Sequence, residues 1–402
     1  MYRSLLFPAL TLLGCTLVLA CASSGSDEPS GAPPIVASGS TPGTLSMAEI
    51  RTALAALGAH EPFVPETLVG LPPDLSEFIP AADPLTPAKV SLGEQLYFDP
   101  RLSRDGSVSC ASCHHPDLGW TDRRPVSTGI HGQLGGRSAP TVMNRLLGKS
   151  QFWDGRAATL EEQAAGPVEN PIEMGFLWDE AAALLNGIEG YRIQFEAVFG
   201  GPASKDTATR AIAAFERTVL AAGSPYDYFE RATPWYKIDI EEEDDEEVIA
   251  RFKEAMKGEE EHPLTDLALQ GRELFFGKAN CSACHVGWDL SDEDFHNIGV
   301  GMDAAEPDLG RFDFTGKDED KGKFKTPPLH NIADTAPYMH DGSMATLREV
   351  VEHYNQGGIA NPTLSDKIFA LELTDEEVDA VVEFMQQGLQ GTVTPVTPPK
   401  LP

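Results

Sequence analysis

The chain has 402 residues, of which 62 are acidic and 30 are basic, so its formal net charge is −32 at pH 7. A surface of this sign repels polyanions, which excludes nucleic acid as a partner and excludes binding to acidic lipid by charge alone. The length is sufficient for two domains with separate hydrophobic cores.

An export signal is predicted at residues 1–20. Arg3 supplies a positive charge, and the apolar run after it is too short and too broken to span a membrane. The four residues ending at Cys21 resemble the bacterial lipobox, in which the cysteine becomes the lipidated first residue of the mature protein. A similar site at Cys15 would leave a shorter apolar core. Residues 21–45 are rich in Ser, Gly and Pro and are expected to form a flexible tether. We therefore expect a periplasmic protein with a lipid anchor at Cys21.

Hydrophobic periodicity after the tether is mostly helical. Thr86-Pro87 predicts a helix start, residues 207–220 place apolar side chains on one stripe, and Thr374-x-x-Glu377 is a capping box before a further helix. Long alternating strands are absent from the pattern.

Composition divides this helical region into four segments. They are an N-terminal domain (46–225), an acidic insert or linker (226–262), a C-terminal domain (263–390) and a Pro- and Thr-rich tail (391–402) that we expect to be disordered. The insert contains the acidic run 239–247, for which a solvated loop of like charges is the simplest interpretation.

The motif Cys-x-x-Cys-His occurs twice, as Cys110-Ala-Ser-Cys113-His114 and as Cys281-Ser-Ala-Cys284-His285. It is the attachment sequence of c-type haem: the two thiols form thioethers with the vinyl groups, and the histidine binds the iron. Zinc knuckles or a dithiol redox centre also use Cys-x-x-Cys. The wide separation of the two copies, the histidine after each and the export signal favour haem. We therefore predict two covalent haems, haem one at the first motif and haem two at the second.

An internal repeat connects the two motifs. Asn331 follows Asn144, and Asp341-Gly follows Asp154-Gly, at a constant offset of 187 residues. The repeat predicts two related halves, and hence a mostly α fold with two cytochrome c-like domains that each carry one covalent haem. At the same offset, Tyr354 stands opposite Pro167. Because proline lacks an N–H, Gly166-Pro167 is expected to break the helix of the first half, whereas Tyr354 should point inward from an intact helix.

Further motifs occur in a fixed order, at residues 110–116, 152–157, 162–167, 173–175 and 335–342. In these motifs, and over residues from about 85 to 389, the chain resembles the bacterial di-haem cytochrome c peroxidase and MauG family. The resemblance implies that haem one meets hydrogen peroxide and that haem two handles electrons. It also implies that Trp153 lies between the haems and that Gln163, Pro167 and Glu173 form the peroxide pocket. In that pocket we expect Glu173 to act as the general acid–base that moves a proton between the two peroxide oxygens.

The sixth ligand of haem two divides this family. Ordinary di-haem peroxidases have a methionine where this chain has Tyr354, and MauG-type proteins have a tyrosine. Phenolate stabilises ferric and higher oxidation states, whereas thioether raises the potential. We therefore expect Tyr354 to be the distal ligand of the haem two iron. The alternative is that Tyr354 is a hydrogen-bonded core residue and that Met339, Met344 or His340 is the ligand.

Two other expectations come from the resemblance. His131 matches a loop that in many relatives supplies a resting ligand to haem one; a solvent-exposed histidine is the alternative. Thr335 and Pro337 match carbonyl donors to a calcium between the domains, but Ser138 stands where an asparagine is usual, so this ion is less secure.

Three functions are compatible with these features. The first is a periplasmic peroxidase that draws electrons from a small donor cytochrome or cupredoxin, for which the acidic run would be a docking patch. The second is a MauG-like enzyme that oxidises residues of a partner protein through a bis-ferryl state, with Trp120, Trp178, Trp235 and Trp288 as surface candidates. The third is a non-catalytic electron carrier or haem sensor, against which the intact peroxide pocket argues. Family members are often homodimers, so the resemblance also implies a homodimer.

Overall fold

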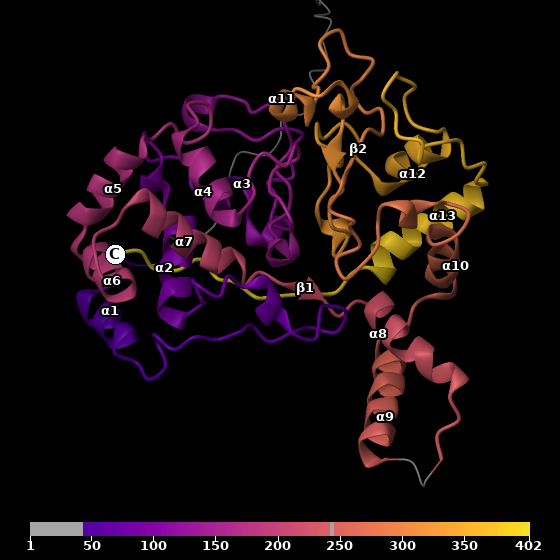
Figure 1. The fold of residues 1–402 in the computed structure, drawn as a ribbon, viewed down its shortest axis with the longest axis horizontal. Coiled ribbons are helices and arrows are strands. Elements are labelled where there is room, and N and C mark those ends of the chain that lie inside the picture. The colour runs from indigo at the N-terminus through magenta and orange to yellow at the C-terminus, as the bar shows by residue number, and fades with distance from the viewer. Residues whose placement is uncertain (1–42, 242–244) are drawn as a thin grey trace, which may run out of the picture. The chain divides into compact units, whose positions relative to one another are not determined.

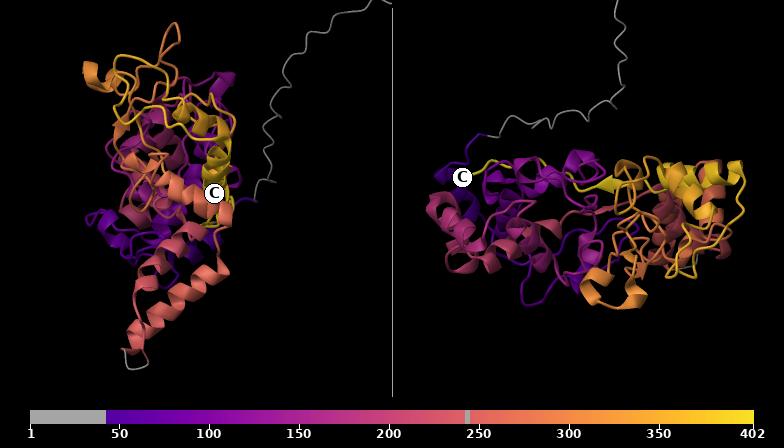
Figure 2. Two further views of the ribbon diagram at one scale, coloured as in Figure 1. Left: turned by 90° about the vertical axis from the view of Figure 1, so that its right-hand side faces the viewer. Right: turned by 90° about the horizontal axis from the view of Figure 1, so that it is seen from above.

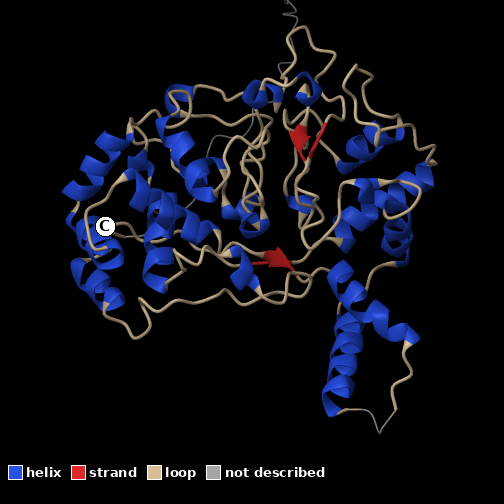
Figure 3. Ribbon diagram, viewed as in Figure 1, coloured by secondary structure: helices blue, strands red, loops and turns tan. Residues whose placement is uncertain are grey.

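The computed structural model describes residues 43–241 and 245–402. The predicted signal, Cys21 and nearly all of the predicted tether therefore lie outside the described residues. Within them the chain is mostly helical, as expected, and its few strands are two residues long (Figure 3). None of the described helices has the length and apolar character needed to cross a membrane.

Seven α-helices form the first half of the described chain (Figure 1). They are α1 (Met47–Leu54), α2 (Pro87–Phe98), α3 (Cys110–Cys113), α4 (Leu160–Glu169), α5 (Trp178–Gly187), α6 (Glu189–Phe199) and α7 (Lys205–Glu216). Short 3-10 turns lie at Leu75–Phe78, Pro100–Leu102, Pro116–Leu118, Ile130–Gly132 and Arg145–Leu147.

The second half repeats the design with fewer helices. They are α10 (Asp266–Phe275), α11 (Phe312–Thr315), α12 (Leu347–Asn355) and α13 (Asp375–Glu383), which continues as a π turn (Phe384–Gly388). Strand β2 (Phe295–His296) pairs with β3 (Phe324–Lys325). The 3-10 turns here are Cys281–Ala283, Asp318–Asp320 and Ile332–Asp334.

Each half is organised by one close helix crossing. Thr86 caps α2 and Pro87 opens it, as predicted. Helix α2 packs on α7 at Gly93, where any Cβ would overlap the carbonyl of Ala211. Helix α10 packs on α13 in the same way, with Gly271 against the carbonyl of Ala380. Glycine at these two positions therefore lets the helix backbones approach closely and fixes each crossing.

The predicted repeat is visible in matching contacts. Asn144 and Asn331 both adopt the left-handed conformation before a 3-10 turn. The side chain of Asn144 bonds both backbone groups of Ala221, and the side chain of Asn331 bonds both backbone groups of Gly391. In each half, the equivalent asparagine thus joins the 3-10 turn that follows it to the segment after the last helix of that half.

A helical hairpin lies between the halves in sequence. It consists of α8 (Pro225–Ala232), the 3-10 turn Thr233–Lys237 and α9 (Glu246–Glu261), and Figure 1 shows it projecting from the rest of the described chain. The acidic run was predicted as a loop, yet its last residues begin α9, where Asp245 is the N-cap. Carboxylates are favourable at a helix N-terminus because of the helix dipole.

The predicted disorder of the tail is wrong. Strand β4 (Thr392–Val393) pairs with β1 (Ala221–Ala222), and the carbonyl of Leu401 accepts a bond from the amide of Leu45. The last residue, Pro402, accepts a bond from Arg101. Figures 1 and 2 show the tail returning from the second half along the first. Proline and threonine disfavour a helix but are compatible with this extended path.

The expected helix break at Gly166-Pro167 is also wrong. Helix α4 continues through Pro167 to Glu169. Proline lies in the last turn, so only one intrahelical hydrogen bond is lost. The backbone beyond it is held by bonds from Asn170 to the Gly166 carbonyl and from Met174 to the Pro167 carbonyl.

Candidate active site

Both Cys-x-x-Cys-His motifs open into one cavity of about 790 Å³. Its wall is mostly apolar and comes from both halves, which makes it suitable for two flat, largely apolar groups. The cavity is lined by every cysteine and histidine of the two motifs: Cys110, Cys113, His114, Cys281, Cys284 and His285.

The first motif presents a neutral imidazole to this cavity. Cys110 and Cys113 are on α3, and His114 follows as its C-cap. The His114 Nδ1 lies 2.9 Å from the carbonyl oxygen of Pro140, which can only accept a hydrogen bond. Nδ1 therefore carries the proton, and the Nε2 lone pair is free for a metal. Burial lowers the pKa of His114, which keeps the ring neutral.

The second motif has the same arrangement. The His285 Nδ1 lies 2.7 Å from the carbonyl oxygen of Leu290, and burial lowers the pKa of His285 to about 4. None of the four motif cysteines is paired in a disulfide. Two thiols and one oriented imidazole on each side of the cavity are the donor set of c-type haem.

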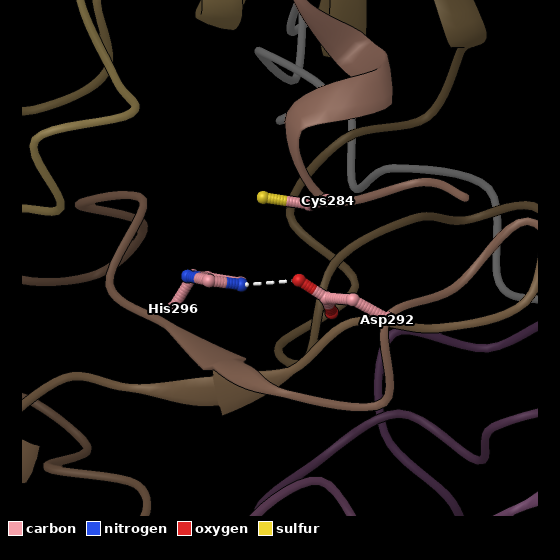
Figure 4. A group of neighbouring side chains, drawn as sticks. All are labelled: Cys284, Asp292 and His296. Atoms are coloured by element: carbon pink, nitrogen blue, oxygen red, sulfur yellow. Dashed lines mark hydrogen bonds and ion pairs between the residues drawn. The ribbon is translucent and has the colours of Figure 1, made fainter. Parts of the chain in front are cut away.

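Zinc is a poorer match to this geometry. Among the described residues, one group of three or more potential ligands comes together, and it holds one cysteine: Cys284 with Asp292 and His296 (Figure 4). His296 is bonded to Asp292 at 2.8 Å, and the ammonium of Lys367 lies 3.5 Å from Asp292. A cation already in this space disfavours a second one, and the two Cys-x-x-Cys pairs do not share a site.

Gln163, Pro167 and Glu173 all line the cavity that His114 lines. The first two are on α4, and Glu173 lies in the turn after it. The Glu173 carboxylate accepts a bond of 2.7 Å from the Asn170 side chain, and its backbone carbonyl accepts one from the Ile130 amide. Burial raises the pKa of Glu173 above its ordinary value, against the opposing effects of Arg156 and Asn170. A carboxyl whose pKa is raised in this way is protonated more readily than an ordinary glutamate, which suits a group that accepts and returns a proton.

Trp153 makes hydrogen bonds to both halves of the chain. Its indole N–H donates to the carbonyl of Ser138 at 2.9 Å, and its own carbonyl accepts a bond of 2.7 Å from the Lys325 amide in β3. The Ser138 amide in turn donates to the carbonyl of His340. Trp153 lines the cavity, with its indole bonded to the first half and its backbone carbonyl bonded to the second.

Tyr354 lies on α12 and lines the cavity near the second motif. Burial and the neighbouring Cys284 and Cys281 raise the pKa of Tyr354. Within the described residues its hydroxyl has no protein hydrogen-bond partner, unlike that of Tyr338, which donates to the Ile332 carbonyl. The alternative of a hydrogen-bonded core tyrosine is therefore not what the structure shows.

Of the other candidate ligands, Met344 and His340 are less well placed. Met344 is not on the cavity wall. His340 lies on the wall but stacks on Phe324 with ring centroids 3.6 Å apart, beside Asp308 and Arg137 at the junction of the halves. Met339 also lines the cavity.

His131 lies outside the cavity. Its side chain is 64% exposed, and Nδ1 is 3.4 Å from a carboxylate oxygen of Asp105. Gly129, Gly135 and Gly136 of the same loop do line the cavity. The structure thus has the solvent-exposed alternative, on a loop that borders the site.

Ser138, Thr335 and Pro337 do lie together on the cavity wall. However, the Ser138 carbonyl accepts the Trp153 indole N–H, and the Thr335 hydroxyl donates to the Ile332 carbonyl. Calcium takes six to eight oxygen ligands, usually with carboxylates, and these residues offer none. The calcium site stays a prediction, and nothing below depends on it.

Arg145 and Glu216 are among the charged residues of the wall that sequence reasoning missed. Both are buried, which is rare for such side chains unless they are paired. Glu216 directly follows Phe215, the residue that packs beneath Gly93. The position of Glu216 next to Phe215 could be read from the sequence, but its burial could be inferred only by knowing which helices cross.

Comparison with known proteins places this site in a family. The model of the di-haem cytochrome c peroxidase family matches residues 87–233, and that of cytochrome c matches residues 268–388. The chain is 37% identical to the methylamine utilization protein MauG of Methylorubrum extorquens over 80% of this chain and 84% of that protein. It is 34% identical to the cytochrome c551 peroxidase of Nitrosomonas europaea over 85% and 88%.

A solved structure gives the same result. The crystal structure of a MauG-like protein associated with microbial copper homeostasis superposes with a TM-score of 0.66 at 32% identity, covering 78% of this chain and 92% of that one. Together with the two oriented Cys-x-x-Cys-His motifs, these matches establish two c-type haems. The chain belongs to the di-haem cytochrome c peroxidase and MauG family and is a peroxide-utilising oxidoreductase.

Proposed function

We propose that the protein reduces hydrogen peroxide at haem one with electrons that a small donor protein delivers through haem two. The observation that carries this proposal is the placement of Gln163, Pro167 and Glu173 on the wall of the cavity that His114 enters. Pro167 offers no group that can bind iron, so peroxide has access to the metal. An electron carrier or haem sensor has no need of a half-buried acid–base carboxyl there.

When bound, haem one supplies an iron that coordinates peroxide and accepts its oxidising equivalents. Glu173 takes the proton from the oxygen next to the iron and delivers it to the far oxygen, which then leaves as water. Asn170 holds the carboxylate in place for both steps. Overall, two electrons from the donor and two protons from solvent would convert one hydrogen peroxide into two waters.

Trp153 is the connection between the two haem sites in this proposal. It contacts the first half through Ser138 and the second through Lys325, so its indole is held rigidly on the wall of the shared cavity. A fixed aromatic ring between two redox centres shortens each electron-transfer step.

The donor is tested directly. With both haems attached, the protein should oxidise a reduced small c-type cytochrome or cupredoxin only when peroxide is added, consuming two donor molecules per peroxide. Net basic donors should react faster than acidic ones, and the difference should shrink as salt is added, because the chain carries a charge of −32. Peroxide consumption that no such donor accelerates would contradict this reading.

The second candidate is a MauG-like enzyme that oxidises residues of a partner protein. The observation in its favour is Tyr354, whose hydroxyl has no partner in the described part of the chain and which faces the second motif. Of the tryptophans considered, Trp120 and Trp178 are buried, whereas Trp288 is 54% exposed and lies three residues after His285. Trp288 is thus the best-placed exit for oxidising equivalents.

The proposed location is the periplasm, with a lipid anchor at Cys21. This part of the proposal is supported by the sequence of the first 21 residues alone.

A further inference from the structure

Glu216 is a buried carboxyl that the proposed reaction does not use. It is 5% exposed, and its Oε2 has no hydrogen-bond partner in the structure. The side chain nevertheless lines the cavity, one helical turn beyond Ile212 on α7. An unpaired buried carboxylate is costly, so a group in the cavity or a proton must compensate it.

The charged neighbours of Glu216 are already engaged. Arg217 makes two bonds to Glu161, and Arg145 makes two to Glu293 and one to Gln151.

These neighbours also affect the ionisation of Glu216. Arg217 and Arg145 favour the ionised carboxyl, whereas Glu161 disfavours it. Tyr97 on α2 and Cys110 on α3 face it as well. Burial dominates this balance and raises the pKa of Glu216 to about 8.

The second half shows that the fold does not require this carboxyl. In the matching helix crossings Phe215 packs beneath Gly93 and Phe384 packs beneath Gly271. The residue after each phenylalanine lines the cavity, and it is Glu216 in the first half but Met385 in the second. The chain therefore places an ionisable side chain beside haem one, whereas the matching position beside haem two holds the uncharged side chain of Met385.

We propose that Glu216 is the proton-exchanging group of haem one, binding a proton when that haem gains an electron and releasing it when the electron leaves. The balance is one electron to the ferric iron and one proton from solvent to the Glu216 carboxylate. The physical cause is charge: in a site of low dielectric constant, removing one positive charge from the iron makes the neighbouring carboxylate more basic. Glu216 thus acts on haem one through its electric charge and does not touch peroxide.

This proposal rests on the two-haem centre but not on peroxide turnover, so it can fail without the proposed function failing. The test is a spectroelectrochemical titration of the haem-loaded full chain, without peroxide, over a pH range that brackets 8. Below the pKa of Glu216 in the ferric state the carboxyl is protonated in both states, and the potential of haem one is constant. Above it the potential should fall by about 59 mV for each tenfold drop in proton concentration. The fall should end at the pKa in the ferrous state.

Glu216→Gln keeps the shape of the side chain and should abolish this slope while leaving haem two unchanged. Two controls should retain the slope: Asp206→Asn, whose side chain is exposed on the same helix, and Glu173→Gln, the half-buried carboxyl of the haem one pocket. Glu216→Met, which copies Met385, is the second variant and should behave like Glu216→Gln.

Haem content is measured first in every variant. A slope that persists in Glu216→Gln, or that disappears in Glu173→Gln instead, would overturn the proposal. Loss of haem one from both Glu216 variants would also overturn it, because Glu216 would then be needed to build the site.

Discussion

Replacing Glu173 by Gln is expected to slow the reaction with hydrogen peroxide by about 10²- to 10⁴-fold, the range that general acid–base catalysis contributes. Glutamine preserves the shape of the side chain and can still meet the Asn170 amide group, but it cannot accept and return a proton. Both haems should remain attached because Glu173 is in neither motif. Stopped-flow absorbance of the haem one band after mixing with peroxide measures the rate directly.

The matched control is Glu169→Gln, which changes the last residue of α4 on the surface, where Glu169 pairs with Lys205. Its rate should equal that of the unchanged protein. If Glu173→Gln retained both haems and reacted at the unchanged rate, Glu173 would not be the acid–base group, and the proposed proton path would be lost.

Replacing Tyr354 by Met is expected to raise the reduction potential of haem two by several tenths of a volt, out of about 0.8 V that axial ligation spans. The reason is that a phenolate ligand stabilises ferric iron, whereas a thioether favours the ferrous state. Without a metal, burial raises the pKa of Tyr354. Ionisation of this phenol therefore depends on the positive charge of ferric iron. Potentiometric titration followed at the haem bands measures the change.

Two further variants make the result specific to ligation. Tyr354→Phe removes the oxygen and should leave haem two five-coordinate and high-spin. Tyr338→Phe changes another tyrosine of the cavity wall, whose hydroxyl bonds the Ile332 carbonyl, and should leave the potential where it was. An unchanged potential in Tyr354→Met would show that another residue is the ligand, with Met339 and His340 next on the cavity wall.

The haem sites could be predicted from the sequence because covalent attachment needs a short, contiguous motif. Cys110, His114 and their counterparts carry their chemistry within five residues, whatever the fold around them. Glu173 and Trp153 were found because their motifs recur in order in the family. Their partners Asn170 and Ser138 are nearby in the sequence. The structure therefore shows how the Glu173 and Trp153 side chains are oriented, whereas the sequence had already identified the two residues.

What could not be predicted depends on contacts between distant segments. The tail was assigned as disordered from its composition, but Thr392 pairs with Ala222, and no local pattern shows that partner. Glu216 was overlooked because a glutamate at the end of a helix is ordinarily exposed; only the crossing at Gly93 turns it inward. The error at Pro167 is different: proline was correctly judged unfavourable in a helix, but its cost is small in a last turn.

Low-temperature EPR of the resting diferric protein, before and after one equivalent of hydrogen peroxide, tests the central claim most directly. The claim is that haem one is open to peroxide while Tyr354 ligates haem two. It predicts one high-spin signal and one low-spin signal of His–Tyr type, with both lost on addition of peroxide and a near-infrared charge-resonance band in their place. Two low-spin signals that persist until one electron is added would contradict it, and would mean that the His131 loop closes on haem one at rest.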